Sequence, residues 1–195
     1  MDDRDEQMRA MLATNRAVWD AVAEQFVGST ALPEYGPLTP TEDTLRLLPD
    51  LRGLRVLELG CGSGHSLLYL ARHGAAELWA LDFSPVQVAN ATTLLREHHV
   101  DARLVCSPME ENPGIPNGHF DLVVSVYALG WTVDLTRTLA LVAGYLRPGG
   151  VLVFSWAHPV YQSLAYDAGR FVLQRSYSNE EPEPETNWRG GGPVV

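Results

Sequence analysis

The chain has 195 residues, 46% of them hydrophobic and 19% charged, a composition that fits one globular domain and excludes collagen, a disordered chain or a disulfide scaffold. Its formal net charge of −10 predicts repulsion of nucleic acid and of anionic membranes, and its 14 basic residues are all arginine. The two cysteines, the acidic first residues and the lack of a long apolar run favour a cytoplasmic protein without a membrane span.

The first 50 residues are expected to form a helical lid region. Apolar residues recur at helical spacing over residues 4–26, which predicts an amphipathic helix. A loop rich in proline and glycine follows over residues 28–37. The sequence Thr39-Pro40-Thr41-Glu42 then has the pattern of a capping box with proline in the first turn, and it predicts a second, short helix.

Residues 51–178 are expected to form an α/β domain, because short apolar runs alternate there with helical stretches. The runs predicted to be strands are Val56–Leu59, Leu78–Phe83, Ala102–Cys106, Phe120–Tyr127 and Val151–Trp156. Helices are predicted between them over residues 66–73, 85–98 and 135–146. This order is typical of a Rossmann-like, doubly wound and mainly parallel sheet with helices on both faces.

The C-terminal part has a weaker pattern. Residues 171–177 are a candidate sixth strand, so the C-terminal strands of the sheet are expected to be incomplete. An open sheet edge of this kind is a possible site for a homo-oligomer. The alternating proline and glutamate that follow, and then a run of glycine, predict an acidic loop or a disordered tail over residues 179–195.

The most informative motif joins the first predicted strand to a helix. It reads Glu58-Leu59-Gly60-Cys61-Gly62-Ser63-Gly64-His65. Glycine permits positive φ and lets a ligand approach the main chain, while the helix N-terminus offers unpaired N–H groups. At the carboxyl end of the first strand of an open α/β sheet, such a turn is where nucleotides bind.

Spacing separates two classes of cofactor. A dinucleotide fingerprint, G-x-G-x-x-G, needs its third glycine where this chain has His65. Glu58 precedes the loop and suits a ligand with ammonium and sulfonium charges. Asp82, 22 residues after Gly60, ends the second strand, where a carboxylate can accept hydrogen bonds from both ribose hydroxyls. Phe83 follows and can lie on an adenine face.

These residues resemble the class I S-adenosylmethionine-dependent methyltransferases. Residues 58–64 look like the first motif of the family and Asp82 like the acidic residue of the second. Residues 120–123 look like its fourth strand and residues 146–152 like the turn into its fifth. The resemblance covers about residues 15–165. It is nearest to a small-molecule branch similar to the ubiquinone and menaquinone biosynthesis methyltransferases.

The resemblance implies which residues bind S-adenosylmethionine. The glycine loop would approach the methionine part, Asp82 the ribose, and the loop after the third strand the adenine. The main chain near Ser125 would face the methionine moiety. The family often has an aspartate at the adenine amino group, where this chain offers Met109, Glu110 and Glu111. The candidate cofactor-binding residues are Glu58, Gly60, Cys61, Gly62, Ser63, Gly64, Asp82, Phe83, Met109, Glu110 and Ser125.

Candidates for catalysis and acceptor binding rest on fewer observations. His158 follows the fifth predicted strand and, with Tyr127, is a candidate to accept a proton; a histidine that only hydrogen-bonds a loop is the open alternative. Trp19, Tyr35 and Trp131 are candidates for an apolar acceptor pocket, with plain core packing as the alternative. No His, Cys, Asp or Glu residues have the spacing of a metal site, so no metal is expected.

The sequence therefore predicts an enzyme that transfers a methyl group from S-adenosylmethionine to a small organic acceptor by in-line displacement, with S-adenosylhomocysteine as product. Two alternatives stay open. One is a non-catalytic S-adenosylmethionine-binding module that acts through partners. The other is a nicotinamide-dependent oxidoreductase, against which His65 argues.

Overall fold

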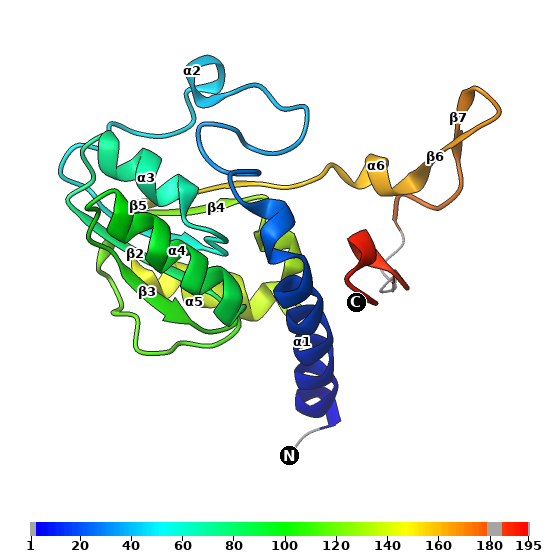
Figure 1. The fold of residues 1–195 in the computed structure, drawn as a ribbon, viewed down its shortest axis with the longest axis horizontal. Helices are drawn as coiled ribbons and strands as arrows, with labels where there is room; N and C mark the ends of the chain where they lie inside the picture. Colours follow the sequence, from blue (N-terminus) through cyan, green and yellow to red (C-terminus); the bar gives the residue numbers. More distant parts are fainter. Residues whose placement is uncertain (1–2, 179–184, 195) are drawn as a thin grey trace.

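A parallel sheet forms the centre of the molecule. The structure, a computed structural model, describes residues 3–178 and 185–194 (Figure 1). All strand pairs of this five-stranded sheet are parallel, in the order β3-β2-β1-β4-β5. Its strands are β1 (Arg55–Leu59), β2 (Glu77–Asp82), β3 (Arg103–Cys106), β4 (Phe120–Val126) and β5 (Leu146–Ser155). The predicted α/β fold with a mainly parallel sheet is confirmed.

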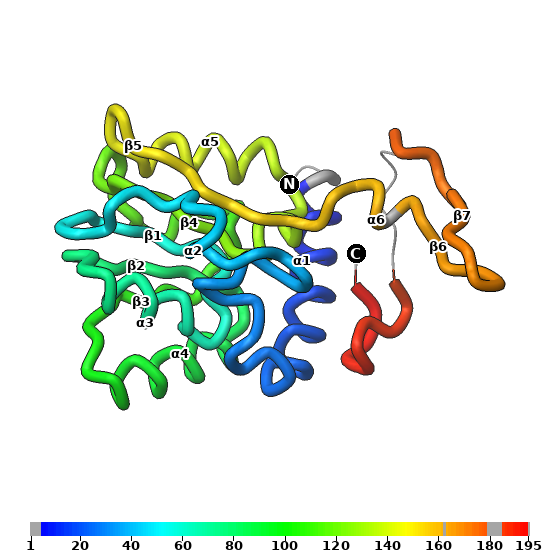
Figure 2. The backbone as a smooth tube through the Cα atoms, turned by 90° about the horizontal axis from the view of Figure 1, so that it is seen from above, coloured from blue at the N-terminus to red at the C-terminus, as the bar shows by residue number. Residues whose placement is uncertain are grey.

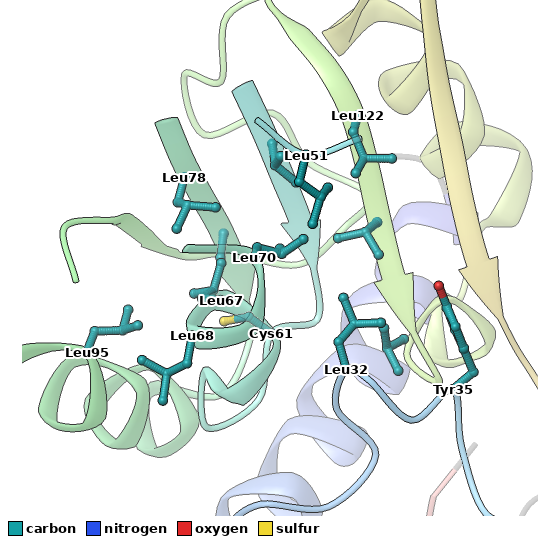
Figure 3. Packing of buried hydrophobic residues seen from close by; sticks show 14 residues of the cluster. Leu32, Tyr35, Leu51, Cys61, Leu67, Leu68, Leu70, Leu78, Leu95 and Leu122 are labelled. Carbon is teal, nitrogen blue, oxygen red and sulfur yellow. The ribbon is translucent and has the colours of Figure 1, made fainter. Parts of the chain in front are cut away.

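Helices cover both faces of the sheet because successive strand residues point to opposite sides. On one face, α3 (His65–Arg72) and α4 (Pro85–Glu97) pack on strand residues such as Val56 and Leu122. Figure 3 shows the leucines of α3 in one cluster with Leu78 of β2 and Leu95 of α4. On the other face, α5 (Leu135–Tyr145) packs on residues such as Leu57. Each fully buried leucine contributes about 1.5–3 kcal/mol through the hydrophobic effect.

Helix α1 (Asp3–Val22) lies across the carboxyl ends of the strands (Figure 1). Its last turn tightens into the 3-10 helix η1 (Ala23–Phe26), so the predicted helix over residues 4–26 is confirmed. In the part of the chain that the structure describes, no helix is both long and apolar enough to cross a membrane.

The second predicted helix is shorter than expected, and its capping box is wrong. Helix α2 spans only Glu42–Leu45, and no side chain caps it. The Thr39 hydroxyl donates instead to the Gly36 carbonyl (2.7 Å). The Glu42 carboxylate accepts hydrogen bonds from the Tyr35 hydroxyl (2.7 Å) and from the main-chain N–H groups of residues 47 and 48. A buried carboxylate with three partners does not reach back to the helix start.

The C-terminal elements stand apart from the main sheet (Figures 1 and 2). Helix α6 (Pro159–Ser163) leads into an antiparallel hairpin of β6 (Leu164–Asp167) and β7 (Arg170–Leu173). The predicted sixth strand therefore exists over part of its range, and it pairs with β6 and not with the main sheet as described. Strand β5 is an edge of the sheet as described, and Val151 and Phe154 on it are exposed.

The last described segment, residues 185–194, lies against α1 (Figure 2). This C-terminal turn contains the 3-10 helix η3 (Trp188–Gly190), and two main-chain hydrogen bonds between Glu185 and Val194 join its ends. The proline- and glutamate-rich stretch 179–184 of the predicted tail lies outside the described residues.

Candidate functional site

A cleft opens where the carboxyl ends of β1, β2 and β4 meet α1. The empty space within it is about 800 Å³, including the part that is open to solvent. The residues that line it come from the glycine loop, from the loops after β2, β3 and β4, and from the N-terminal segment. They include Leu12, Trp19, Phe26, Ser29, Thr30, Glu58, Gly60, Cys61, Gly62, Ser63, His65, Asp82, Phe83, Gln87, Met109, Glu110, Tyr127, Trp131 and Thr132. This is the edge at which open α/β sheets bind ligands.

The three glycines of the loop have positive φ, and each has a different role. A Cβ on Gly62 would meet nothing within 4 Å, so the main chain there is open to a ligand. A Cβ on Gly60 would lie 2.4 Å from the Ala128 Cβ, so this glycine permits close approach of the loop after β4. Gly64 does not line the cleft; its α-carbon faces Ala91 of α4, and it permits close packing of α3 on α4.

Asp82, the last residue of β2, lines the cleft. One carboxylate oxygen accepts a hydrogen bond from Gly62 N (2.9 Å) and the other from Ser84 N (2.9 Å). These bonds fix the glycine loop against the loop after β2. Burial raises the pKa of Asp82 to about 6, against the opposing effect of the two N–H donors. Each carboxylate oxygen keeps a further lone pair that can accept a hydrogen bond from a ligand hydroxyl.

Glu58 lines the cleft and, like Glu110, has only 1% of its surface exposed. Burial raises its pKa to about 8, although a hydrogen bond from Ser66 opposes the rise. Its Oε2 atom has no hydrogen-bond partner among the described residues. A buried carboxylate with an unpartnered oxygen is suited to a cationic group of a ligand, which would stabilise its charged form.

The stability of the fold should therefore depend on pH through Glu58. An acid whose pKa is higher in the folded than in the unfolded chain stabilises the fold at low pH, and this contribution is lost as pH rises through the folded value. We expect the free energy of unfolding to fall between about pH 5 and pH 8, with Asp82 contributing to the fall at the lower end of that range. In Glu58→Gln the fall should be shallower. Urea unfolding across this pH range measures the free energy of unfolding of the wild type and of Glu58→Gln. Parallel pH profiles for the two proteins would contradict the assignment of this pH dependence to Glu58.

The loop after β3 supplies two of the candidate adenine-binding residues, Met109 and Glu110. Met109 lines the cleft and packs against the α5 face of the sheet. Glu110 also lines the cleft, but its Oε1 atom accepts hydrogen bonds from the Thr132 hydroxyl (2.5 Å) and from Val133 N (2.6 Å). The side chain thereby holds the segment that follows the 3-10 helix η2 (Leu129–Trp131). It acts as a structural tie between two walls of the cleft.

The other predicted cofactor residues divide into two groups. Phe83, Cys61 and Ser63 line the cleft, and the Ser63 hydroxyl donates to Gln87 Oε1 (3.0 Å). Burial raises the pKa of the Cys61 thiol, which keeps it protonated and opposes a role as nucleophile. Ser125 does not line the cleft, and its hydroxyl donates to the Leu59 carbonyl (3.1 Å).

The candidates for acceptor binding and catalysis are not all brought together. Trp19, Trp131 and Tyr127 line the cleft. Tyr35 does not; it is buried in the core and bonded to Glu42, as in the packing alternative. His158 also lies outside the cleft lining. It is exposed, and its Nδ1 accepts a hydrogen bond from Val160 N (3.2 Å) at the start of α6, so the geometry favours the loop-bonding alternative.

Two parts of the cleft were missed by sequence reasoning. His65 lines it with a buried Nε2 atom that has no partner in the described part of the chain, and burial lowers its pKa. Its place directly after the glycine loop was the signal that could have identified it. The loop 29–31 has no sequence signal, because a long-range contact places it: Leu32 N donates to the Ser66 hydroxyl (3.1 Å). Among residues 3–178 and 185–194, no three His, Cys, Asp or Glu side chains are grouped to hold a metal.

Comparisons with known proteins agree with this geometry. Residues 56–150 match the family model described as a methyltransferase domain. The chain is 35% identical over 117 residues to a malonyl-[acyl-carrier protein] O-methyltransferase of Pectobacterium atrosepticum. The matched region covers 60% of this chain and 44% of that protein. It is 32% identical over 135 residues to a ubiquinone biosynthesis O-methyltransferase of Bradyrhizobium diazoefficiens. This matched region covers 68% of this chain and 52% of that protein.

Among solved structures, an S-adenosylmethionine-dependent methyltransferase from Mesorhizobium loti is 31% identical with a TM-score of 0.58, over 66% of this chain and 60% of that chain. The chain spans about half the length of the curated relatives that it matches. The motif order, the parallel sheet and the cleft at its carboxyl edge all agree with these matches. The chain is thus similar in sequence and fold to S-adenosylmethionine-dependent methyltransferases, and its residues 56–150 match a methyltransferase domain.

Proposed function

We propose that the chain transfers the methyl group of S-adenosylmethionine to a small organic acceptor and releases S-adenosylhomocysteine. The observation that carries the proposal is the two-ended cleft. One end has buried polar groups on the glycine loop and after β2, and the other has aromatic side chains from α1 and from the loop after β4. A donor with charged and ribose groups and an apolar acceptor would then meet in one enclosed space.

The polar end fits the donor in three respects. The unpartnered oxygen of Glu58 would pair with the ammonium group, the carboxylate of Asp82 would accept from the ribose hydroxyls, and the open main chain at Gly62 would allow close approach. Phe83 and Met109 would enclose the adenine. S-adenosylmethionine supplies a methyl carbon that its sulfonium already activates, so the protein mainly orients the two reactants and excludes water. Such orientation supplies on the order of 7–11 kcal/mol of a barrier.

A proton acceptor is needed only where the acceptor loses a proton. We propose Tyr127 for this role, because it lines the cleft. Its ring is held in place by contacts with Gly36 and Trp156. A Cβ at Gly36 would come within 2.5 Å of the Tyr127 ring, so this glycine leaves space for the tyrosine. His158 would serve only if α6 moved toward the cleft, since its side chain now caps that helix.

Further proposals concern the setting of the reaction. Residues 1–50 would act as a lid, because Leu12, Trp19 and Thr30 line the cleft. A cytoplasmic location is supported by the two free cysteines. A small-molecule acceptor rather than nucleic acid is supported by the net charge of −10. Association of two copies through β5 is supported by the exposed Val151 and Phe154 at that sheet edge.

The test is transfer of a labelled methyl group. We expect the protein, incubated with methyl-labelled S-adenosylmethionine and a protein-free cell extract, to form S-adenosylhomocysteine and a labelled small molecule. Tyr127→Phe should lower the rate by about 10²- to 10⁴-fold for a hydroxyl acceptor, and His158→Ala should change it little. Binding of S-adenosylhomocysteine without any transfer would contradict the proposal and favour a non-catalytic cofactor-binding module.

A further inference from the structure

The apolar end of the cleft is a group of aromatic rings in mutual contact. Trp19 lies 4.8 Å from Phe26 and 5.2 Å from Trp131, measured between ring centroids. All three line the cleft, and none of them is fully buried. Flat rings of this kind stack on, or meet edge to face with, other flat rings. The Nε1 atom of Trp19 is buried and has no hydrogen-bond partner in the described structure, so its N–H is an unsatisfied donor.

A fourth ring supports this aromatic wall from behind. Trp188, in the C-terminal turn 185–194, does not line the cleft but contacts all three rings. Its ring is nearly parallel to that of Phe26, at 7° and 5.5 Å, and its centroid lies 4.9 Å from Trp19 and from Trp131. The turn is seated closely on α1, since a Cβ on Gly191 would come within 2.6 Å of Val22. Trp188 therefore positions the rings that face the cleft.

The charge of the cleft restricts what can lie against this wall. The acidic side chains that line it are Glu58, Asp82 and Glu110. No arginine of the described residues lines the cleft, and the sequence has no lysine. His65 is the one basic side chain among the lining residues that the structure describes, and burial opposes its protonation. The Arg189 guanidinium lies 5.0 Å over the Phe26 ring but does not line the cleft. An anionic acceptor would therefore meet acidic side chains and no arginine on the cleft lining.

We propose that the acceptor is a planar, uncharged ring compound that carries a hydroxyl or carbonyl oxygen, and that Trp188 is a positioning residue for its binding site. The rings of Trp19, Phe26 and Trp131 would contact the faces and edges of the acceptor, and the Trp19 N–H would bond its oxygen. The inference rests on the proposed function, because it assigns the polar end of the cleft to the methyl donor.

Calorimetric titration of 2-naphthol and of 2-naphthoate into the protein saturated with S-adenosylhomocysteine tests the proposal. The two probes share one ring system and differ in charge at pH 7. We expect 2-naphthol to bind at least about tenfold more tightly than 2-naphthoate. Trp188→Ala should weaken 2-naphthol binding by about tenfold, and Trp188→Phe, which keeps a ring, should restore most of the affinity. Tyr161→Ala, at an exposed aromatic side chain of α6, is the matched control and should change nothing.

The affinity for S-adenosylhomocysteine shows whether Trp188→Ala affects only the acceptor site or disturbs the structure of the whole cleft. We expect it to change less than about twofold in Trp188→Ala, since Trp188 contacts the aromatic wall and does not line the cleft. Equal losses for both ligands, unchanged 2-naphthol binding in Trp188→Ala, or equal affinity for 2-naphthoate would each overturn the inference and leave the proposed function intact. Failure of the wild-type protein to bind S-adenosylhomocysteine would instead overturn the proposed function and the inference with it.

Discussion

Asp82→Ala is expected to weaken the binding of S-adenosylhomocysteine by roughly 30- to 150-fold, which corresponds to about 2–3 kcal/mol. The loss has two sources. The variant removes the carboxylate that would accept from the ribose hydroxyls, and it leaves Gly62 N and Ser84 N without their present acceptors. The glycine loop then loses the contact that holds its main chain toward the cleft. Calorimetry at 25 °C on the folded variant measures the effect.

Asp101→Ala is the matched control for Asp82→Ala. Asp101 is an exposed aspartate that precedes β3 and does not line the cleft, so its removal changes the net charge by the same amount. We expect its affinity for S-adenosylhomocysteine to stay within about twofold of wild type. Equal affinities of Asp82→Ala and Asp101→Ala would remove Asp82 from the cofactor site.

Glu110→Ala is expected to lower the free energy of unfolding by about 2–4 kcal/mol, because hydrogen bonds to a buried charged group contribute about 1.5–3 kcal/mol each. The variant leaves Val133 N and the Thr132 hydroxyl without the oxygen that now accepts from both. Since Trp131 directly precedes these residues, the aromatic wall should also lose its fixed position. Urea unfolding followed by circular dichroism measures the change in stability.

The adjacent residue provides the control for this variant. Glu111 is exposed, so Glu111→Ala should change the free energy of unfolding by less than about 0.5 kcal/mol. Glu110→Gln keeps the carbonyl oxygen as an acceptor and should recover part of the loss. A destabilisation below about 1 kcal/mol in Glu110→Ala would show that the two short hydrogen bonds do not tie the loops together.

The sheet was predictable because its signals are local. Val56 and Leu57 are buried on opposite faces, so β1 contains adjacent apolar residues instead of a strict apolar–polar alternation, and the same holds for β2 and β4. The Ser84 cap of α4 was also predictable, and its hydroxyl accepts from Gln87 N (3.1 Å) as a capping residue does. The glycine loop was placed correctly because a strand, a tight turn and a helix start must follow one another there.

The site was less predictable where a distant partner decides what a side chain does. Glu110 follows β3 as the adenine-binding position should, but residues 132 and 133, more than 20 positions later, take up its carboxylate. Tyr35 is drawn into the core by Glu42, and His158 is turned toward α6. Trp188 had no periodic neighbours to mark it, and only the packing of the C-terminal turn on α1 reveals its contacts.

The most direct test of the account is a calorimetric comparison of S-adenosylhomocysteine with NAD on the wild-type protein. We predict micromolar binding of S-adenosylhomocysteine and binding of NAD at least about a hundredfold weaker, because the turn has His65 where a pyrophosphate site needs its third glycine. NAD binding as tight as that of S-adenosylhomocysteine would contradict the assignment of the cleft, and so would the absence of S-adenosylhomocysteine binding by the folded protein.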